Sequence, residues 1–369
     1  MGLIKRGGLG LVVVVACSWP VEAFAGGLLQ PSDYTAIAPT LTETGNYSVN
    51  TSGSTPTITL PDGTVLNGVL DPTGQIAVFT FGSINIGPGV NSVMTVTGSN
   101  AVAILSQGNF TISNEFQVSV SAPDNGTGPG GYAVGGPGAG SSTMASGGGG
   151  GYGGLGGAGG EGYYTDSGRT VPGGAGGSTY GLTTAGLIGG SAGSGAGGGG
   201  AIEFGAGKTM SLSGLNVSAN GGNDTYYQAG FGGNSGGGGS GGEVAFLGSS
   251  VSLNVVVTAQ GGIGGVPFNP MYGDFLQGGY GGSGGGGLVQ IQSNNISLDP
   301  STFNLQGGGS GAGSGGISEF DSNGVFTGFL ATPEPSSIVM AGIAAAAGLA
   351  TALGRRHRRR RASQQRSIT

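Results

Sequence analysis

Glycine occupies 91 of the 369 positions in this chain, about one residue in four against a usual share of roughly 7%. Collagen is excluded, because runs such as Gly147–Gly151 break any Gly-X-Y period. An α-helical domain is disfavoured, because glycine costs about 1 kcal/mol per helical position relative to alanine. The mean hydropathy of +0.12 is too high for an ordinary disordered chain. An all-β or glycine-loop protein remains.

Four segments share one pattern of three short runs in which apolar and polar residues alternate, and they begin at Ala101, Ala201, Glu243 and Leu288. Such alternation is typical of half-buried β-strands. The last three units each follow a polyglycine patch and end in a polar residue followed by glycines, and their starts lie 42 and then 45 residues apart. The pattern therefore predicts a repeat with insertions between its units.

Strands this short gain stability when each repeat stacks on the next in register and builds one apolar column. We therefore predict an all-β fold: a parallel β-solenoid (β-helix) over residues 101–316 with long Gly-rich loops. Residues 26–100 continue the β pattern and are expected to include a cap. Residues 125–196 are interpreted as a mobile loop, with loosely packed polyproline II strands or a hidden coil as alternatives. Residues 317–332 are expected to be a linker.

Residues 1–25 have the three parts of a secretory signal peptide. These parts are a positive start at Lys5 and Arg6, a short apolar core at Leu9–Cys17, and a small-x-small cleavage site at Ala23-Phe24-Ala25. Two alternatives stay open: a cytoplasmic apolar strand, and a lipoprotein cut before Cys17. Because Cys17 is the only cysteine, a chain cut after Ala25 has no disulfides.

The C-terminus carries a second targeting pattern. A Pro-Glu-Pro motif at 333–335 precedes an apolar stretch at 337–353, which is about 26 Å long as a helix and close to the minimum for one membrane crossing. A basic cluster then fixes that end in the cytoplasm, ahead of a tail at 362–369. The cluster consists of Arg355, Arg356, Arg358, Arg359, Arg360 and Arg361.

This order of motif, apolar span and arginines over residues 333–361 resembles the PEP-CTERM sorting signal of Gram-negative exported proteins. The resemblance implies that Pro333, Glu334 and Pro335 are recognised by an exosortase-type membrane protease that removes the tail. It also implies exopolysaccharide as a partner. The stretch Phe79–Gly87, followed by Leu105–Gly108, is similar to Gly-rich exported proteins of the same class. A plain membrane anchor is the alternative interpretation of the tail.

Charge and residue types exclude several functions. Between residues 26 and 332 two basic residues, Arg169 and Lys208, stand against fifteen acidic ones, a formal charge of −13 that repels nucleic acid. The only histidine, His357, lies among the tail arginines, so we expect no His-based triad and no His metal site in the body. We expect no cofactor and no metal, although Gly221–Asp224 is similar to one fragment of a calcium repeat.

Polysaccharide contact is the remaining binding chemistry. Seven aromatic residues fall between the repeats, and aromatic rings on exposed loops stack on sugars. They are Tyr226, Tyr227, Phe231, Phe268, Tyr272, Phe275 and Tyr280. The acids are scattered, and a polysaccharide lyase would need its base from Arg169 or Lys208. We therefore expect a non-catalytic protein of the cell surface or extracellular, biofilm-associated matrix that is exported and anchored transiently in the inner membrane. A carbohydrate-binding adhesin is the alternative, followed by a polysaccharide-degrading β-helix enzyme.

Overall fold

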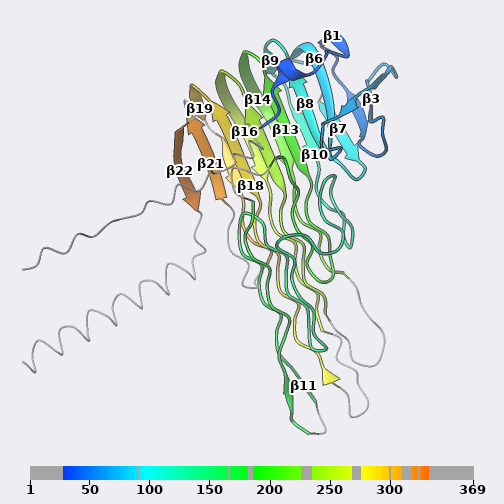
Figure 1. Cartoon of the computed structure of the whole chain (residues 1–369), viewed down its shortest axis with the longest axis vertical. Helices are drawn as coiled ribbons and strands as arrows, with labels where there is room; N and C mark the ends of the chain where they lie inside the picture. Colours follow the sequence, from blue (N-terminus) through cyan, green and yellow to red (C-terminus); the bar gives the residue numbers. More distant parts are fainter. Residues whose placement is uncertain are drawn as a thin grey trace, which may run out of the picture.

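The computed structural model describes residues 28–331 except 90, 165–166, 182–185, 226–234, 268–275, 299–300, 310–316 and 323–324, with the backbone alone at 276–277 and 317–331. These residues form a body of strands from which long glycine-rich segments project (Figure 1). The body is a 19-stranded, mostly parallel sheet. A single turn of 3-10 helix, η1 (Pro31–Asp33), is the one helical element in the described part of the chain. The predicted all-β class is confirmed.

The first runs of the repeats pair as one parallel ladder, which we call the first ladder. Its strands are β6 (Ile76–Ile86), β8 (Ala101–Ser106), β13 (Ala201–Ala206), β15 (Glu243–Leu247), β18 (Leu288–Ser293) and β21 (Ile317–Ser322). The predicted unit starts are aligned here, since Ala201 pairs with Glu243 and Glu243 with Leu288. The repeat read from the sequence is therefore confirmed at the level of strand register.

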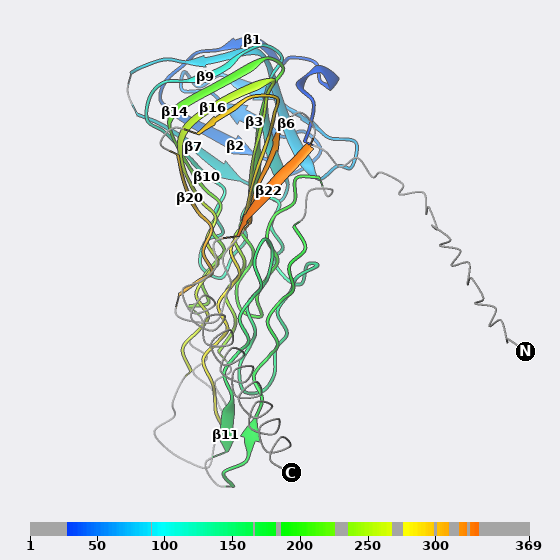
Figure 2. The ribbon, with the colours of Figure 1, turned by 90° about the vertical axis from the view of Figure 1, so that its left-hand side faces the viewer.

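The second and third runs pair in the same way and give a second and a third ladder. The second ladder joins the end of β6, β9 (Phe110–Ile112), the first half of β14 (Thr209–Ser218), the first half of β16 (Ser250–Thr258) and β19 (Ile296–Leu298). The third joins β2 (Asn46–Asn50), β7 (Ser92–Thr97), β10 (Phe116–Ser119), the second halves of β14 and β16, and β20 (Thr302–Asn304). In side view β6 and β20 lie on opposite sides, with β14 and β16 crossing between them (Figure 2).

The two ends of the body use antiparallel pairs. At the N-terminal end β2, β3 (Thr57–Thr59) and β4 (Val65–Asn67) pair in turn, β5 (Val69–Leu70) pairs with β6, and β1 (Ala38–Leu41) lies parallel to β6. At the other end β22 (Val325–Ala331) pairs with β21. Residues 317–322 and 325–331 are therefore strands and not the expected linker, because the edge of β18 offers backbone groups that β21 satisfies. Residues 76–97 likewise belong to the ladders themselves.

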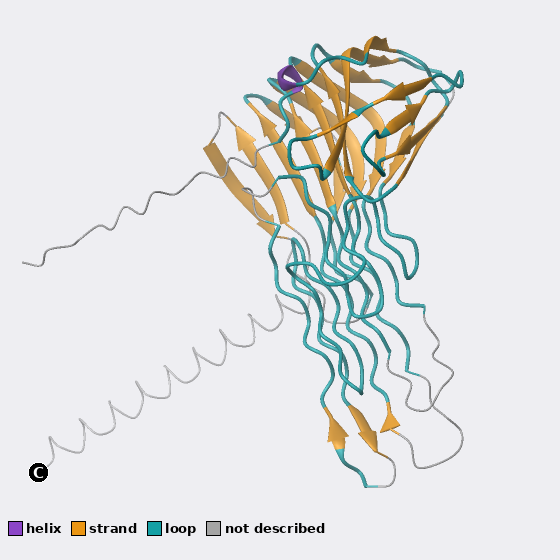
Figure 3. Cartoon of the chain, turned by 45° about the vertical axis from the view of Figure 1, so that its right-hand side comes forward, coloured by secondary structure: helices purple, strands orange, loops and turns teal. Residues whose placement is uncertain are grey.

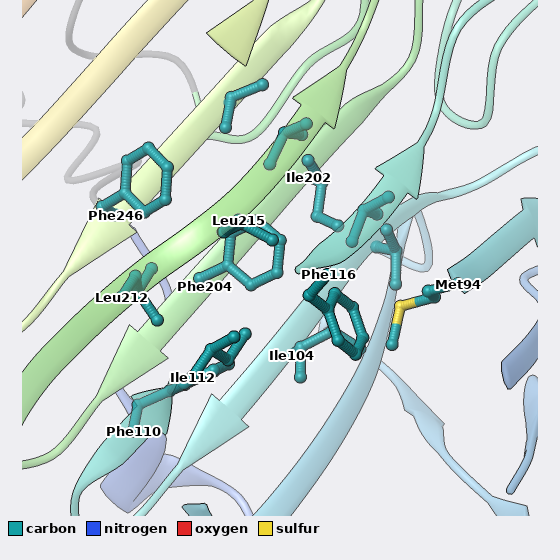
Figure 4. Packing of buried hydrophobic residues seen from close by; sticks show 14 of the residues in the cluster. Met94, Ile104, Phe110, Ile112, Phe116, Ile202, Phe204, Leu212, Leu215 and Phe246 are labelled. Atoms are coloured by element: carbon teal, nitrogen blue, oxygen red, sulfur yellow. The ribbon is translucent and has the colours of Figure 1, made fainter. Parts of the chain in front are cut away.

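The inward-facing residues form one continuous core between the ladders. The parallel register places large apolar side chains next to one another on successive strands of the first ladder. In order they are Phe79, Ile104, Phe204, Phe246 and Ile291. The rings of Phe204 and Phe246 stack with centroids 5.7 Å apart (Figure 4). Burying such side chains is worth roughly 1.5–3 kcal/mol each, so the column stabilises the stack of short strands.

The glycine-rich segments link the end of the third ladder to the start of the first ladder in the next unit. They run side by side away from the body to a small sheet at the far end (Figure 3). That sheet consists of β11 (Gly162–Tyr164), β12 (Thr170–Val171) and β17 (Leu276–Gln277). We call the set of segments 122–200, 219–242, 259–287 and 305–309, within its described residues, the glycine bundle.

Hydrogen bonds between neighbouring segments hold the glycine bundle together, and they have a period of three residues. Segment 154–160 shows the pattern most fully. Gly154, Gly157 and Gly160 donate to the carbonyls of Gly286, Ser283 and Tyr280, with N···O distances of 3.0, 2.8 and 2.7 Å. Gly156 and Gly159 donate to a different segment, at Gly177 and Gly174, over 2.9 and 2.8 Å. A three-residue period is that of the polyproline II helix, whose backbone groups all point outward.

Glycine is required here by close approach. An alanine Cβ at Gly239 would lie 1.8 Å from the carbonyl oxygen of Gly197, and one at Gly242 would lie 1.8 Å from that of Gly200. The described residues of 125–196 are thus part of a hydrogen-bonded bundle, and the interpretation as a mobile loop is corrected. The alternative of loosely packed polyproline II strands agrees better with the observed hydrogen-bond period, but the segments are closely and not loosely packed.

Candidate functional site

The residues predicted to direct export and sorting lie outside the described residues. They are Ala23, Ala25, Pro333, Glu334, Pro335 and the six arginines at 355, 356 and 358–361. The apolar stretch 337–353 lies outside them as well. Within the described part of the chain, no helix has the length and apolar character needed to cross a membrane.

The outward side of the third ladder carries two rows of uncharged side chains. Strand alternation points every second residue away from the core, and the parallel register brings those residues into line. The first row is Asn46, Val93, Gln117, Asn216, Val256 and Thr302, and the second is Ser48, Thr95, Ser119, Ser218, Thr258 and Asn304. We call these two rows the third-ladder face. It combines hydroxyl and amide groups with two exposed valines, Val93 and Val256.

A shallow groove of about 260 Å³ lies on this face and is lined from β7, β10, β14 and β16. Its lining includes Val93, Gln117, Asn216 and Val256, and none of its lining residues is charged. Sequence reasoning missed this feature because it considered only the aromatic residues of the loops as a binding surface. The available signal was the unit alignment itself, which puts Gln117, Asn216 and Val256 in one column.

The other unusual side chains are two buried glutamates on the outward side of the first ladder. Glu203 on β13 is 0% exposed, and Glu243 on β15 is 2% exposed. They project from adjacent strands, since Glu203 pairs with Ala245 and Glu243 with Ala201. The segment from Leu28 to Tyr34 packs over this side of the sheet. This covering makes the glutamates interior residues.

Glu203 holds the covering segment by a hydrogen bond from the Leu29 N–H to Oε2, over 3.1 Å. Its Oε1 has no hydrogen-bond partner among the described residues. Burial raises the pKa of Glu203 to about 8; the Leu29 hydrogen bond lowers it, and the charge of Glu243 raises it further. Glu203 is therefore mainly protonated at pH 7.

Glu243 anchors a second covering segment. Its Oε2 accepts hydrogen bonds from the Tyr152 hydroxyl at 2.7 Å and from the Ile188 N–H at 3.2 Å. Burial and the nearby Glu243 charge together raise the pKa of Tyr152 well above its ordinary value. The arrangement fastens the glycine bundle to the first ladder, which is a structural role.

The remaining sequence candidates are not brought together. Arg169 and Lys208 are both exposed, on the β11–β12 turn and on the turn before β14. Asp224, in the fragment similar to a calcium repeat, is buried among glycine backbones, and its N–H donates to Ile263 O over 3.0 Å. No group of three or more metal-ligating side chains occurs among the described residues.

Of the seven aromatic residues between repeats, Tyr280 is 67% exposed and the other six fall outside the described residues. Comparison of the chain with protein-family models, with curated proteins and with solved structures finds no match.

Proposed function

We propose that this chain is an exported, non-catalytic structural protein of the cell surface or extracellular matrix, and that its body is a parallel β-solenoid. The glycine bundle is the observation that carries the functional part. Its segments interact through backbone groups, with N–H to carbonyl bonds such as Gly157 to Ser283 at 2.8 Å and Gly177 to Gly149 at 2.8 Å. A bundle built in this way supplies length and stiffness with few reactive side chains, and those are the properties of a spacer or scaffold.

The common register of the three ladders supports the solenoid. In each unit the chain passes from the first ladder to the second and then to the third, and returns to the first through the glycine bundle. Each coil then needs its neighbours to bury its apolar side, and antiparallel pairs cover the first and last coils.

Export and sorting belong to the same proposal. The signal peptide at 1–25 directs the chain out of the cytoplasm, and the helix at 337–353 holds it briefly in the inner membrane. An exosortase-type protease then acts at Pro333-Glu334-Pro335 and releases the body to the surface. The resemblance of the tail to the PEP-CTERM signal and the acidic, cysteine-free body support this route.

The first test is the intact mass and location of the protein made by its native host. We expect a chain that begins near Gly26, ends near Pro335 and is recovered from the outer surface or the medium. A matched strain lacking residues 355–361 should retain the tail and accumulate in the inner membrane. A wild-type chain that keeps residues 336–369 in the inner membrane would overturn the matrix role.

A further inference from the structure

The third-ladder face has the properties of a binding surface for an extended polymer. We propose that it binds a neutral, linear polysaccharide lying across the strands. The inference deepens the proposed function, on which it rests, by naming the matrix component that the body would hold. It also differs from the expectation that loop aromatics bind sugar, because the residues involved lie on the strands.

The chemistry of the face is that of a sugar site. The side-chain amides of Gln117 and Asn216 make no hydrogen bond to another described side chain or backbone group, and they point outward beside the hydroxyls of Ser119 and Ser218. A pyranose ring offers hydroxyls at its rim and C–H groups on its faces. Amides and hydroxyls bind the rim, while the exposed Val93 and Val256 contact the faces.

The spacing of the face fits a polymer. Neighbouring strands lie about 4.8 Å apart, so the six rungs from Asn46 to Thr302 each present one uncharged outward side chain, at even spacing over about 24 Å. One rung is close to the length of one sugar residue in an extended chain. A periodic row therefore meets a periodic ligand, and weak contacts add along its length.

Charge selects the type of polysaccharide. The groove has no charged lining residue, whereas the chain from residue 26 to 332 carries a formal charge of −13. An acidic polysaccharide would be repelled by the body and would find no cation on this face. A neutral polysaccharide meets neither penalty, so it is the complementary occupant.

The test measures binding of the full chain to a soluble linear β-glucan and to alginate by affinity gel electrophoresis. We expect retardation by the β-glucan, little dependence on salt, and none by alginate. The double variant Gln117→Ala/Asn216→Ala removes two amide partners and should weaken binding at least tenfold. The control Ser211→Ala/Ser252→Ala alters the outward row of the second ladder, on β14 and β16, and should bind like wild type.

Three results would overturn the inference: binding to alginate alone, equal weakening by the control pair, or no binding to the β-glucan by a chain whose circular dichroism is intact. None of these results would by itself refute the proposed matrix role, which is decided by location and mass. A variant that has lost its β spectrum is replaced by Val256→Thr, which keeps a β-branched side chain and removes one apolar contact. It should weaken binding about threefold.

Discussion

At the scale of single residues, the most demanding positions are glycines whose missing Cβ makes room for a neighbouring carbonyl. Gly239 is such a position, and its φ does not lie in the left-handed region. The requirement is therefore one of space and not of backbone conformation. Glycines in loops are more often required because of their backbone conformation. Substitution by alanine tests whether space is the requirement at Gly239.

The variant Gly239→Ala should lower the free energy of unfolding by about 2–3 kcal/mol, because the backbone of Gly197 must move to admit the methyl group. Urea unfolding followed by circular dichroism measures the change. The matched control is Gly87→Ala, where a Cβ meets no described heavy atom within 4 Å. Equal stability of the two variants would show that the segments are not packed as closely as described.

Glu203 gives the body a pH dependence of definite sign. Its pKa is about 8 when folded against an ordinary value of 4.5, so the folded chain keeps a proton that the unfolded chain loses. Stability from this group is present below about pH 4.5 and is lost as the pH rises to about 8. The loss is on the order of 1 kcal/mol per pH unit in that window.

The variant Glu203→Gln keeps the shape of the protonated side chain and removes its titration. We expect its free energy of unfolding to change less between pH 5 and pH 8 than that of wild type. Chemical denaturation at both pH values measures this, with the exposed Glu161→Gln as the control. Parallel profiles for wild type and Glu203→Gln would contradict the assignment.

At the scale of elements, the strands were predictable and their covering was not. Apolar–polar alternation gave the runs, and the spacing of the units gave the register in which Ala201 meets Glu243. The same alternation placed Glu203 and Glu243 on the outward side, where a charged residue is expected to meet water. Their burial depends on residues 28–34 and on Tyr152 and Ile188, which no local pattern connects to these strands.

The stacked apolar side chains of the first ladder determine how much stability is lost when one of them is truncated. Phe204 stacks on Phe246 at 5.7 Å and meets the edge of Phe110 at 6.0 Å. The variant Phe204→Ala should lose about 3–5 kcal/mol, because the strands on either side cannot close the cavity. Thermal unfolding compares it with Val256→Ala, whose side chain is 41% exposed and should cost under about 0.5 kcal/mol. Similar costs for both would mean that this column is not tightly packed.

At the scale of the whole molecule, the body and the glycine bundle are two different solutions to the same need for paired backbone groups. The body uses side chains to build a core, so its sequence reveals it. The glycine bundle uses almost none, and a run such as Gly197–Gly200 has the same letters as a flexible linker. This is why sequence reasoning located residues 125–196 but misjudged their order.

Hydrogen exchange distinguishes the two descriptions. Amides in 147–151 and 238–242 donate to carbonyls of neighbouring segments, and these residues are buried. We expect them to exchange at least a hundredfold more slowly than the exposed turn at 52–55. Mass spectrometry of peptides from the two regions measures the ratio. Exchange of both regions within the same few seconds would restore the mobile-loop interpretation.

The three-residue period has a consequence for how the register of neighbouring glycine-rich segments is fixed. If a run of identical glycines slides by one full turn past its neighbour, every contact is replaced by an equivalent one. The contacts within the glycine bundle therefore specify the register between its segments only weakly. The alignment is fixed instead where the segments join side chains that differ from one another, at Val120 just after β10, at Ala201 on β13 and at Leu288 on β18. The strands of the body thus fix the register of glycine-rich segments that could otherwise pair in several equivalent ways.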